Sequence, residues 1–191
     1  QVQYVIRPQQ TAYHDYRGFA GKVNSGHFSV GDTVWVAPSG QKTKIERIEK
    51  YGVEVAHVKS GENATLLLAD AVDASRGSTI HTQGESLENT QHIEAQLCWM
   101  QTEALETRKK YWLQKGALCV LSQVESIEKK IHFDTQKEET TAALKCNDIG
   151  TARLRLAQPL LKTSFAQNKA LGAFVLIDPQ THNTAGVGFI Q

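Results

Sequence analysis

Residues 30–40 read V-G-D-T-V-W-V-A-P-S-G, and this stretch decides the fold class. Its centre, Thr33 to Ala37, is β-branched and aromatic, which favours an extended strand. Gly31-Asp32 before it and Pro38-Ser39-Gly40 after it carry the chemistry of tight turns. More glycines follow the spacing of turns in a barrel or sandwich: Gly26, Gly52, Gly61 and Gly77. The first half is therefore predicted to be antiparallel β.

Two neighbouring segments support this prediction. Residues 64–69 (A-T-L-L-L-A) are apolar on both faces, as expected for a strand at the centre of a closed barrel. Ile45 and Ile48 are three residues apart, which is a helical spacing, but their segment is short and has no cap. We therefore expect a strand with an irregularity there.

A polar stretch separates the two halves of the chain. Residues 82–91 are polar apart from Leu87, so we predict a linker there, between a first domain at 1–82 and a second at 91–191. Residues 92–99 (H-I-E-A-Q-L-C-W) then alternate between polar and apolar with period two, which predicts a strand.

The remaining pattern of the second half is also mainly β. Residues 137–144 could hold a short helix, but strands and helices do not alternate as they do around a parallel sheet. The second domain is therefore expected to be antiparallel β as well. Further strands are expected at Tyr111 to Leu113, Ala117 to Val124, Lys130 to Phe133, Thr151 to Ala157, Ala173 to Ile177 and Thr184 to Ile190.

Composition excludes several classes of protein. Twenty-one Lys and Arg against 20 Asp and Glu give a net charge of +1, without the basic excess of a phosphate-binding surface. No apolar run is long enough to span a membrane, and the N-terminus lacks the pattern of a signal peptide. The only methionine is Met100, so we expect the chain to be a piece of a longer protein.

Three cysteines in no C-x-x-C pair indicate a reducing compartment, which we take to be the cytoplasm. Cys98 and Cys119 lie in apolar alternating runs, where a thiol usually acts as a small buried hydrophobe. The seven histidines show no metal-ligand spacing, and no serine lies in a G-x-S-x-G motif. The sequence therefore predicts no catalytic and no metal-binding residue.

Nucleotide motifs are present only as fragments. Residues 15–18 fit D-x-x-G, and Asn168-Lys169 begins an N-K-x-D that lacks its Asp, but no P-loop occurs. We therefore expect the chain alone not to bind GTP. Basic runs at 108–110 and 129–130 lie near Tyr111 and Trp112, a combination found in RNA-binding surfaces. Neighbouring strand residues point to opposite faces, so packing is favoured over RNA contact.

The turn-rich first half resembles a known family. The order Gly18 to Val23, Ser25-Gly26, Val30 to Val34 and Pro38 to Gly40 is similar to the second domain of translation-factor GTPases. The resemblance is greatest to the GTPase (large) subunits of bacterial sulfate adenylyltransferases and covers nearly the whole chain. Further matching stretches are Val2 to Pro8, Val72 to Gly77, Cys98 to Met100, Asn147 to Gly150 and Phe174 to Asp178.

This resemblance implies an all-β fold of two consecutive antiparallel β-barrels, like domains 2 and 3 of elongation factor Tu. It also implies a parent complex that makes adenosine 5'-phosphosulfate from ATP and sulfate, coupled to GTP hydrolysis. GTP and Mg would bind a separate G domain, and ATP a small catalytic subunit, so no cofactor is expected in this chain. The G domain and the small subunit are the expected partners.

Four residues are predicted to contribute to a contact with these partners. Tyr16, Arg17, Phe19 and Arg76 combine amphipathic or bidentate side chains with turn positions. Alternatively, Arg76 only braces its own turn beside Gly77. Two other functions stay open: a barrel pair that binds tRNA or ribosomal RNA, and an enzyme with an active site built across strands. The near-neutral charge does not favour nucleic acid, and no membrane partner is expected.

Overall fold

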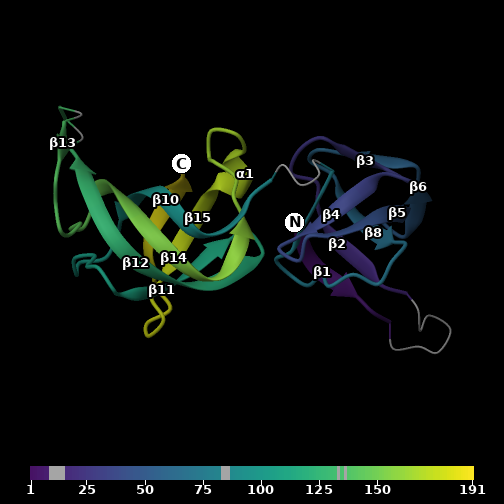
Figure 1. The fold of residues 1–191 in the computed structure, drawn as a ribbon, viewed down its shortest axis with the longest axis horizontal. Coiled ribbons are helices and arrows are strands. Elements are labelled where there is room, and N and C mark those ends of the chain that lie inside the picture. The colour runs from purple at the N-terminus through teal and green to yellow at the C-terminus, as the bar shows by residue number, and fades with distance from the viewer. Residues whose placement is uncertain (9–15, 83–86, 133, 136) are drawn as a thin grey trace. The chain divides into compact units, whose positions relative to one another are not determined.

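The computed structural model describes residues 1–8, 16–82, 87–132, 134–135 and 137–191. The chain divides into two compact units, Gln1–Asn89 and Thr90–Gln191, each of which is built from antiparallel strands (Figure 1). Among the described residues, no helix has the length and hydrophobicity needed to cross a bilayer. Asp15, the first residue of the D-x-x-G fragment, lies outside the described residues.

The first unit contains a sheet whose strands follow the order β1-β2-β8-β5-β4-β9, with β6 paired to β5. A separate pair, β3 and β7, forms a two-stranded sheet. The strands are β1 (Val2–Ile6), β2 (Gly18–Lys22), β3 (His27–Ser29), β4 (Thr33–Ala37), β5 (Gln41–Lys50), β6 (Val53–Val55), β7 (His57–Lys59), β8 (Asn63–Leu68) and β9 (Thr79–His81).

Two backbone hydrogen bonds close this first barrel. The amide of Val2 donates to the carbonyl of Ser78 (2.8 Å), and the amide of Gly77 donates to the carbonyl of Val2 (2.8 Å). They join β1 to the segment just before β9, which is the other end of the sheet. The sheet therefore returns to its own first strand, although this seam is short.

The stretch Thr33 to Ala37, flanked by turns, forms β4 with the predicted bounds. Val34 and Val36 point into the core and are fully buried, while Trp35 between them lies on the outer face. The expected irregularity in β5 is confirmed, because its register against β8 shifts between Ile45 and Arg47. The shift allows Ile45 and Ile48 to be buried together despite their helical spacing.

The second unit is a closed barrel of six strands in the order β11-β15-β16-β10-β14-β12, and β12 pairs again with β11. Strand β13 extends the sheet beyond β12. Its elements are β10 (Asn89–Trp99), β11 (Lys110–Lys115), β12 (Leu118–Ile131), β13 (Glu138–Glu139), β14 (Ile149–Leu161), α1 (Lys169–Gly172), β15 (Ala173–Ile177) and β16 (Thr184–Ile190).

The alternation predicted at 92–99 is confirmed in β10. Ile93, Leu97 and Trp99 face the barrel core, and the Trp99 ring packs edge-on against Tyr111 at 5.4 Å. On β16, Gly188 is the register partner of Phe174, and a Cβ at this position would overlap the Phe174 ring. The packing of Phe174 in this core therefore requires a glycine at position 188. The all-β, two-barrel fold class is confirmed.

The short helix expected at 137–144 is wrong. Glu138–Glu139 is strand β13, and Leu144 is buried in the core and forms a β-bridge with Leu105. A contact distant in sequence therefore keeps this segment extended. The helix in the described part of the chain is α1, which Asn168 caps by accepting hydrogen bonds from the amides of Ala170 and Leu171.

Two other expectations need correction. Cys119 is exposed and Cys98 is only partly buried, because the alternation of each strand places the thiol on the outer face. Cys119 is therefore not the buried hydrophobe that its apolar run predicted. In addition, residues 89–91 belong to β10, so this end of the expected linker is strand.

Candidate functional site

Arg17, directly before β2, is hydrogen-bonded to the backbone of its own barrel. Its guanidinium donates from Nη1 to the carbonyl of Val72 (2.7 Å) and from Nη2 to the carbonyl of Ala74 (3.0 Å). It also lies 5.0 Å from the centre of the Phe19 ring. Burial, together with the nearby charge of Arg7, lowers the pKa of Arg17. Arg17 thus connects the start of β2 to the segment 72–74 by two hydrogen bonds.

Tyr16 next to it forms a second polar contact. Its hydroxyl donates a hydrogen bond to Oε2 of Glu49 (2.6 Å), while Nε of Arg47 lies 3.2 Å from Oε1 of the same carboxylate. The Arg47 guanidinium is 5.9 Å from the centre of the Tyr16 ring. Burial, and then the hydrogen bond to Glu49, raise the pKa of Tyr16 to about 12. The phenol therefore stays protonated at neutral pH.

Phe19 and Arg76 occupy different environments. Phe19 is only 3 % exposed and lies in the core of the first barrel, so its ring packs inside its own unit. Arg76 is exposed, and its Nη1 donates to the carbonyl of Gln3 in β1 (2.7 Å). Arg76 therefore braces the first strand rather than only its own turn. A partner contact through Tyr16, Arg17 and Arg76 stays a prediction.

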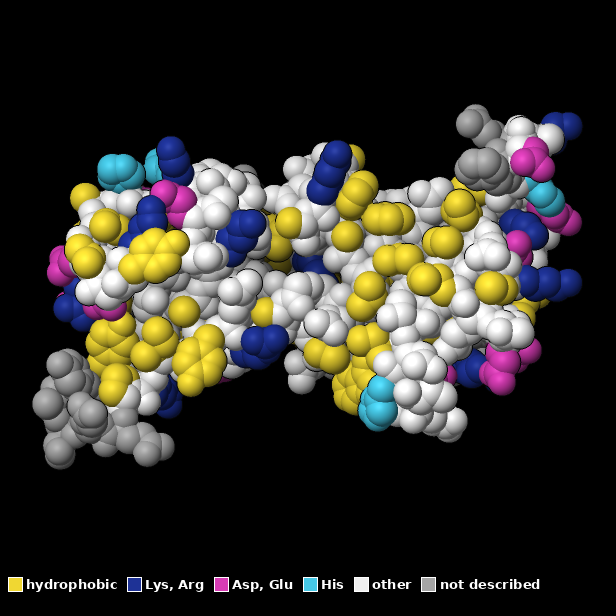
Figure 2. Space-filling view, turned by 180° about the vertical axis from the view of Figure 1, so that it is seen from behind, with side chains coloured by type: hydrophobic (Ala, Val, Ile, Leu, Met, Phe, Trp, Pro, Cys, Tyr) yellow, Lys and Arg dark blue, Asp and Glu magenta, His cyan; other side chains and the backbone are white. Residues whose placement is uncertain are grey.

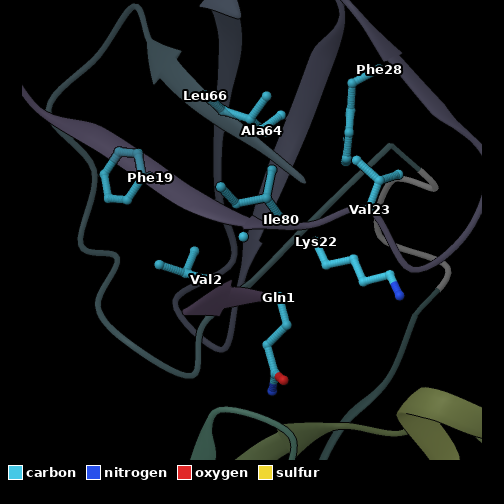
Figure 3. A pocket seen from close by; sticks show the side chains of 10 residues that line it. Gln1, Val2, Phe19, Lys22, Val23, Phe28, Ala64, Leu66 and Ile80 are labelled. Atoms are coloured by element: carbon cyan, nitrogen blue, oxygen red, sulfur yellow. The ribbon is translucent and has the colours of Figure 1, made fainter. Parts of the chain in front are cut away.

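The first barrel also contains a small cavity of about 30 Å³ (Figure 3). It has room for one or two water molecules, not for a nucleotide. Figure 3 shows the side-chain ends of Gln1 and Lys22 directed away from the apolar group that surrounds the cavity. The cavity is therefore a packing gap of the barrel. Its lining comprises Gln1, Val2, Phe19, Gly21, Lys22, Val23, Phe28, Ala64, Leu66 and Ile80.

The second barrel has a larger, polar cleft of about 500 Å³. The loop after β10, the start of β11 and the turn between β15 and β16 surround it. Most of its side chains are amides, hydroxyls and charged groups, so it can bind a polar ligand by hydrogen bonds. These residues, which we call the polar cleft, are Gln101, Thr102, Glu103, Lys109, Lys110, Asp178, Pro179, Gln180, Thr181 and Asn183.

Three charged groups of the polar cleft already have partners. Nζ of Lys109 lies 3.2 Å from Oε2 of Glu103, and this hydrogen bond is the main cause of a raised pKa at Lys109. Oδ1 of Asp178 accepts from the amides of Gln180 (2.8 Å) and Thr181 (2.9 Å). These backbone hydrogen bonds, the one from Thr181 foremost, lower the pKa of Asp178.

Tyr111 lies behind the polar cleft, fully buried beside Trp99. Burial is the main cause of its raised pKa, which the charge of Lys109 partly offsets. A lysine ammonium cannot accept a hydrogen bond, so the phenolic proton has no acceptor among the described residues. The buried hydroxyl therefore keeps an unused donor close to Lys109.

The basic run at residues 129–130 is neutralised by ion pairs with nearby carboxylates. Lys129 pairs with Glu138 (2.7 Å) and Lys130 pairs with Asp148 (2.6 Å). These pairs agree with the near-neutral net charge. Among the described residues, no group of three or more His, Cys, Asp or Glu is arranged to hold a metal ion.

Two features of β11 differ from what the sequence predicts. Trp112 is 38 % exposed, where packing is the favoured interpretation, while Tyr111 on the opposite face is buried. Lys115 is almost fully buried, and its Nζ donates to the carbonyl of Leu161 (2.8 Å). Burial lowers the pKa of Lys115 to about 8. The period of two that places Tyr111 inside also places Lys115 inside, so alternation alone could have found it.

Comparison with known families agrees with the two-barrel architecture. The family described as elongation factor Tu domain 2 matches residues 20–81, and the family described as GTP-eEF1A C-terminal domain-like matches residues 92–191. Among solved structures, Sup35 in complex with GDP is similar with a TM-score of 0.85 at 16 % identity, over 99 % of this chain and 46 % of that one. This likeness concerns the fold.

Curated relatives match the chain from end to end. Sulfate adenylyltransferase subunit 1 of Psychromonas ingrahamii is 36 % identical over 190 residues, which is 100 % of this chain and 40 % of the relative. The bifunctional enzyme CysN/CysC of Xylella fastidiosa is 35 % identical over 190 residues, 30 % of its length. The chain thus spans less than half of these relatives. It belongs to the GTP-eEF1A C-terminal domain-like family and is homologous over its whole length to sulfate adenylyltransferase subunit 1.

Proposed function

We propose that this chain is a non-catalytic, two-barrel region of a sulfate adenylyltransferase GTPase subunit and acts in the cytoplasm. The observation that carries the proposal is the end-to-end match to subunit 1 of that enzyme. In this proposal the parent complex forms adenosine 5'-phosphosulfate and pyrophosphate from ATP and sulfate. A G domain binds GTP and Mg, and a small subunit binds ATP and carries out adenylyl transfer.

The barrels would act as rigid docking bodies in this complex. Each unit has its own core and its own antiparallel sheet, so each can move as one body when a nucleotide-dependent segment orders or relaxes. The hairpin of β5 and β6 offers a docking tip, because Tyr51 is 89 % exposed and Val53 is also exposed. Exposed apolar groups of this size are common in protein interfaces.

The test is co-purification of the small subunit of a sulfate adenylyltransferase with this chain. We expect the small subunit to be retained by the wild type and less by Tyr51→Ala and by Arg76→Ala. Lys44→Ala is the matched control, because Lys44 is an exposed cation of the same barrel. Circular dichroism verifies that each variant is folded. If a folded wild-type chain retains no small subunit, docking through this region is refuted.

Activity assays separate this proposal from that of a free-standing enzyme. We expect the isolated chain to hydrolyse no GTP and to transfer no adenylyl group from ATP to sulfate. Turnover above a heat-inactivated control would contradict a non-catalytic role.

Contact with tRNA or ribosomal RNA is the competing proposal. Lys109, Lys129 and Lys130 are each paired with a carboxylate, which does not favour a phosphate-binding surface. A titration with tRNA at several salt concentrations distinguishes the two. A surface that binds several phosphates loses affinity steeply as salt rises. We expect no such binding, and a steep dependence would favour the translation-factor function.

A further inference from the structure

The outer face of β11 presents a tryptophan beside a lysine. Lys110, Trp112 and Gln114 point outward, while Tyr111 and Leu113 point into the core. Neighbouring side chains on the same face of a strand are roughly 7 Å apart along the chain. The Trp112 indole and the Lys110 ammonium can therefore contact one small ligand together.

Trp112 lies on an apolar surface formed with Leu121 and Ile177, which we call the apolar ledge. Its register partners are Leu121 on β12 and Ile177 on β15, both partly buried. Figure 2 shows several hydrophobic side chains on the visible face of the second unit. With 38 % of its surface exposed, the indole can take a flat aromatic ring as a stacking partner. A nucleobase is such a ring.

Lys110 joins this ledge to the polar cleft, because it also lines the cleft. Lys109 is held by Glu103, but no ion pair engages Lys110 among the described residues. The Asp178 carboxylate accepts hydrogen bonds from two backbone amides, which hold it in its own turn. The Lys110 ammonium is thus the available cation for an anionic group.

The rest of the polar cleft fits the uncharged part of such a ligand. Gln101, Thr102, Gln180 and Asn183 provide amide and hydroxyl groups that can both donate and accept hydrogen bonds. A ribose presents hydroxyls that need such partners. The volume of about 500 Å³ is within the range of small-molecule sites.

We propose that the second barrel binds a free purine nucleoside monophosphate, with its base stacked on Trp112 and its phosphate paired with Lys110. The sugar lies between these two side chains, at the edge of the polar cleft. The charges that face the phosphate are those of Lys109, Glu103 and Asp178 besides Lys110, so one unpaired cation opposes the anion. Binding is therefore expected to be weak and selective for a base rather than for charge. This site does not depend on the function proposed above.

The first test is calorimetric titration of the whole chain with AMP. We expect saturable binding, a loss of affinity of about tenfold or more in Trp112→Ala, and affinity close to the wild type in Trp112→Phe, which keeps an aromatic ring. Because the side chain lies on the surface, the fold is expected to be retained, and a melting curve verifies it. Absence of saturation, or unchanged affinity in a folded Trp112→Ala variant, would overturn the proposal.

The second test separates the base from the phosphate. Lys110→Ala should weaken AMP binding severalfold and leave adenosine binding unchanged, because adenosine carries no phosphate. Lys162→Ala, an exposed cation elsewhere in the same barrel, should change neither. Inorganic phosphate that binds as tightly as AMP would refute stacking on Trp112. An oligoadenylate that binds far more tightly than AMP would assign the surface to RNA instead of a free nucleotide.

Discussion

The two barrels are closed and held together in different ways. The second is sealed by six residue pairs between β11 and β12, from Lys110 with Gln123 to Lys115 with Leu118, whereas the first is sealed by two backbone hydrogen bonds at Val2. Of the twelve largest fully buried side chains in the described part of the chain, all but Ile45 and Ile48 lie in the second unit. The same architecture is thus stabilised by apolar packing in one barrel and relies more on polar braces in the other.

The largest expected effect on the free energy of unfolding comes from a substitution in the core of the second barrel. Trp99→Ala removes a fully buried indole that contacts Tyr111 and donates from Nε1 to the carbonyl of Glu103 (2.7 Å). We expect a loss of about 3–5 kcal/mol in the free energy of unfolding, measured by urea denaturation. Trp112→Ala is the control on the outer face. Equal losses in the two variants would refute the difference between core and surface.

The next prediction concerns a polar group inside the apolar barrel. Lys115 has a pKa of about 8 in the folded protein, against 10.5 without burial. Between these values the unfolded chain binds more protons than the folded one, so the free energy of unfolding should rise with pH from about 8 to 10.5. The full change is about 3 kcal/mol. Below pH 8 both states are protonated, and this contribution is constant.

Denaturation of Lys115→Met at several pH values checks this linkage. Its free energy of unfolding should rise less steeply between pH 8 and 9.5 than that of the wild type. This range lies below the pKa at which Tyr16 titrates in the folded state. Parallel curves for the two proteins would show that Lys115 keeps an ordinary pKa.

The polar brace of the first barrel is tested at Arg17. Arg17→Ala removes one of the two donors to the carbonyl of Val72, which keeps the amide of Ala74, and removes the guanidinium donor to the carbonyl of Ala74. We expect a loss of about 2 kcal/mol in the free energy of unfolding. Arg17→Lys should recover only part of the lost stability, because a single ammonium cannot reproduce the contact of two guanidinium nitrogens with two carbonyls. Hydrogen exchange of β2 and the segment 72–74 locates the effect. A loss of hydrogen-exchange protection confined to the second barrel would show that Arg17 does not stabilise the first barrel.

The smallest expected effect is at the seam of the first barrel. Arg76→Ala removes one exposed hydrogen bond to the carbonyl of Gln3, so we expect a loss of about 0.5–1 kcal/mol. Faster hydrogen exchange in β1, compared with Lys44→Ala, is the measurement. Exchange that stays at the wild-type rate would show that β1 needs no brace from Arg76.

Alternation and turn chemistry predicted most of this fold, because each strand buries one face on its own barrel. The bounds of β4, β15 and β16 follow from them directly. The bridge between Leu105 and Leu144 could not be predicted, since it depends on a contact between residues far apart in sequence. Local composition at 137–144 therefore indicated a helix that the barrel does not permit.

The candidate sites were less predictable for a similar reason. That Tyr111 and Trp112 point to opposite faces follows from strand geometry, but which face is open depends on the curvature of the whole barrel. The side-chain chemistry of Arg17 and Arg76 predicts partner contacts. In the structure both donate to carbonyls of their own barrel, and these contacts depend on the position of the segment 72–78 beside β1 and β2, which local sequence does not reveal.

The seam at Val2 has a mechanical consequence. Since β1 closes the first barrel through its own backbone, any polypeptide joined ahead of Gln1 is attached to a structural strand and not to a loose tail. Tension along such a connection would load the two hydrogen bonds of the seam and the pairing of β1 with β2. The seam is the weaker of the two, because it has fewer residue pairs than β1 has with β2.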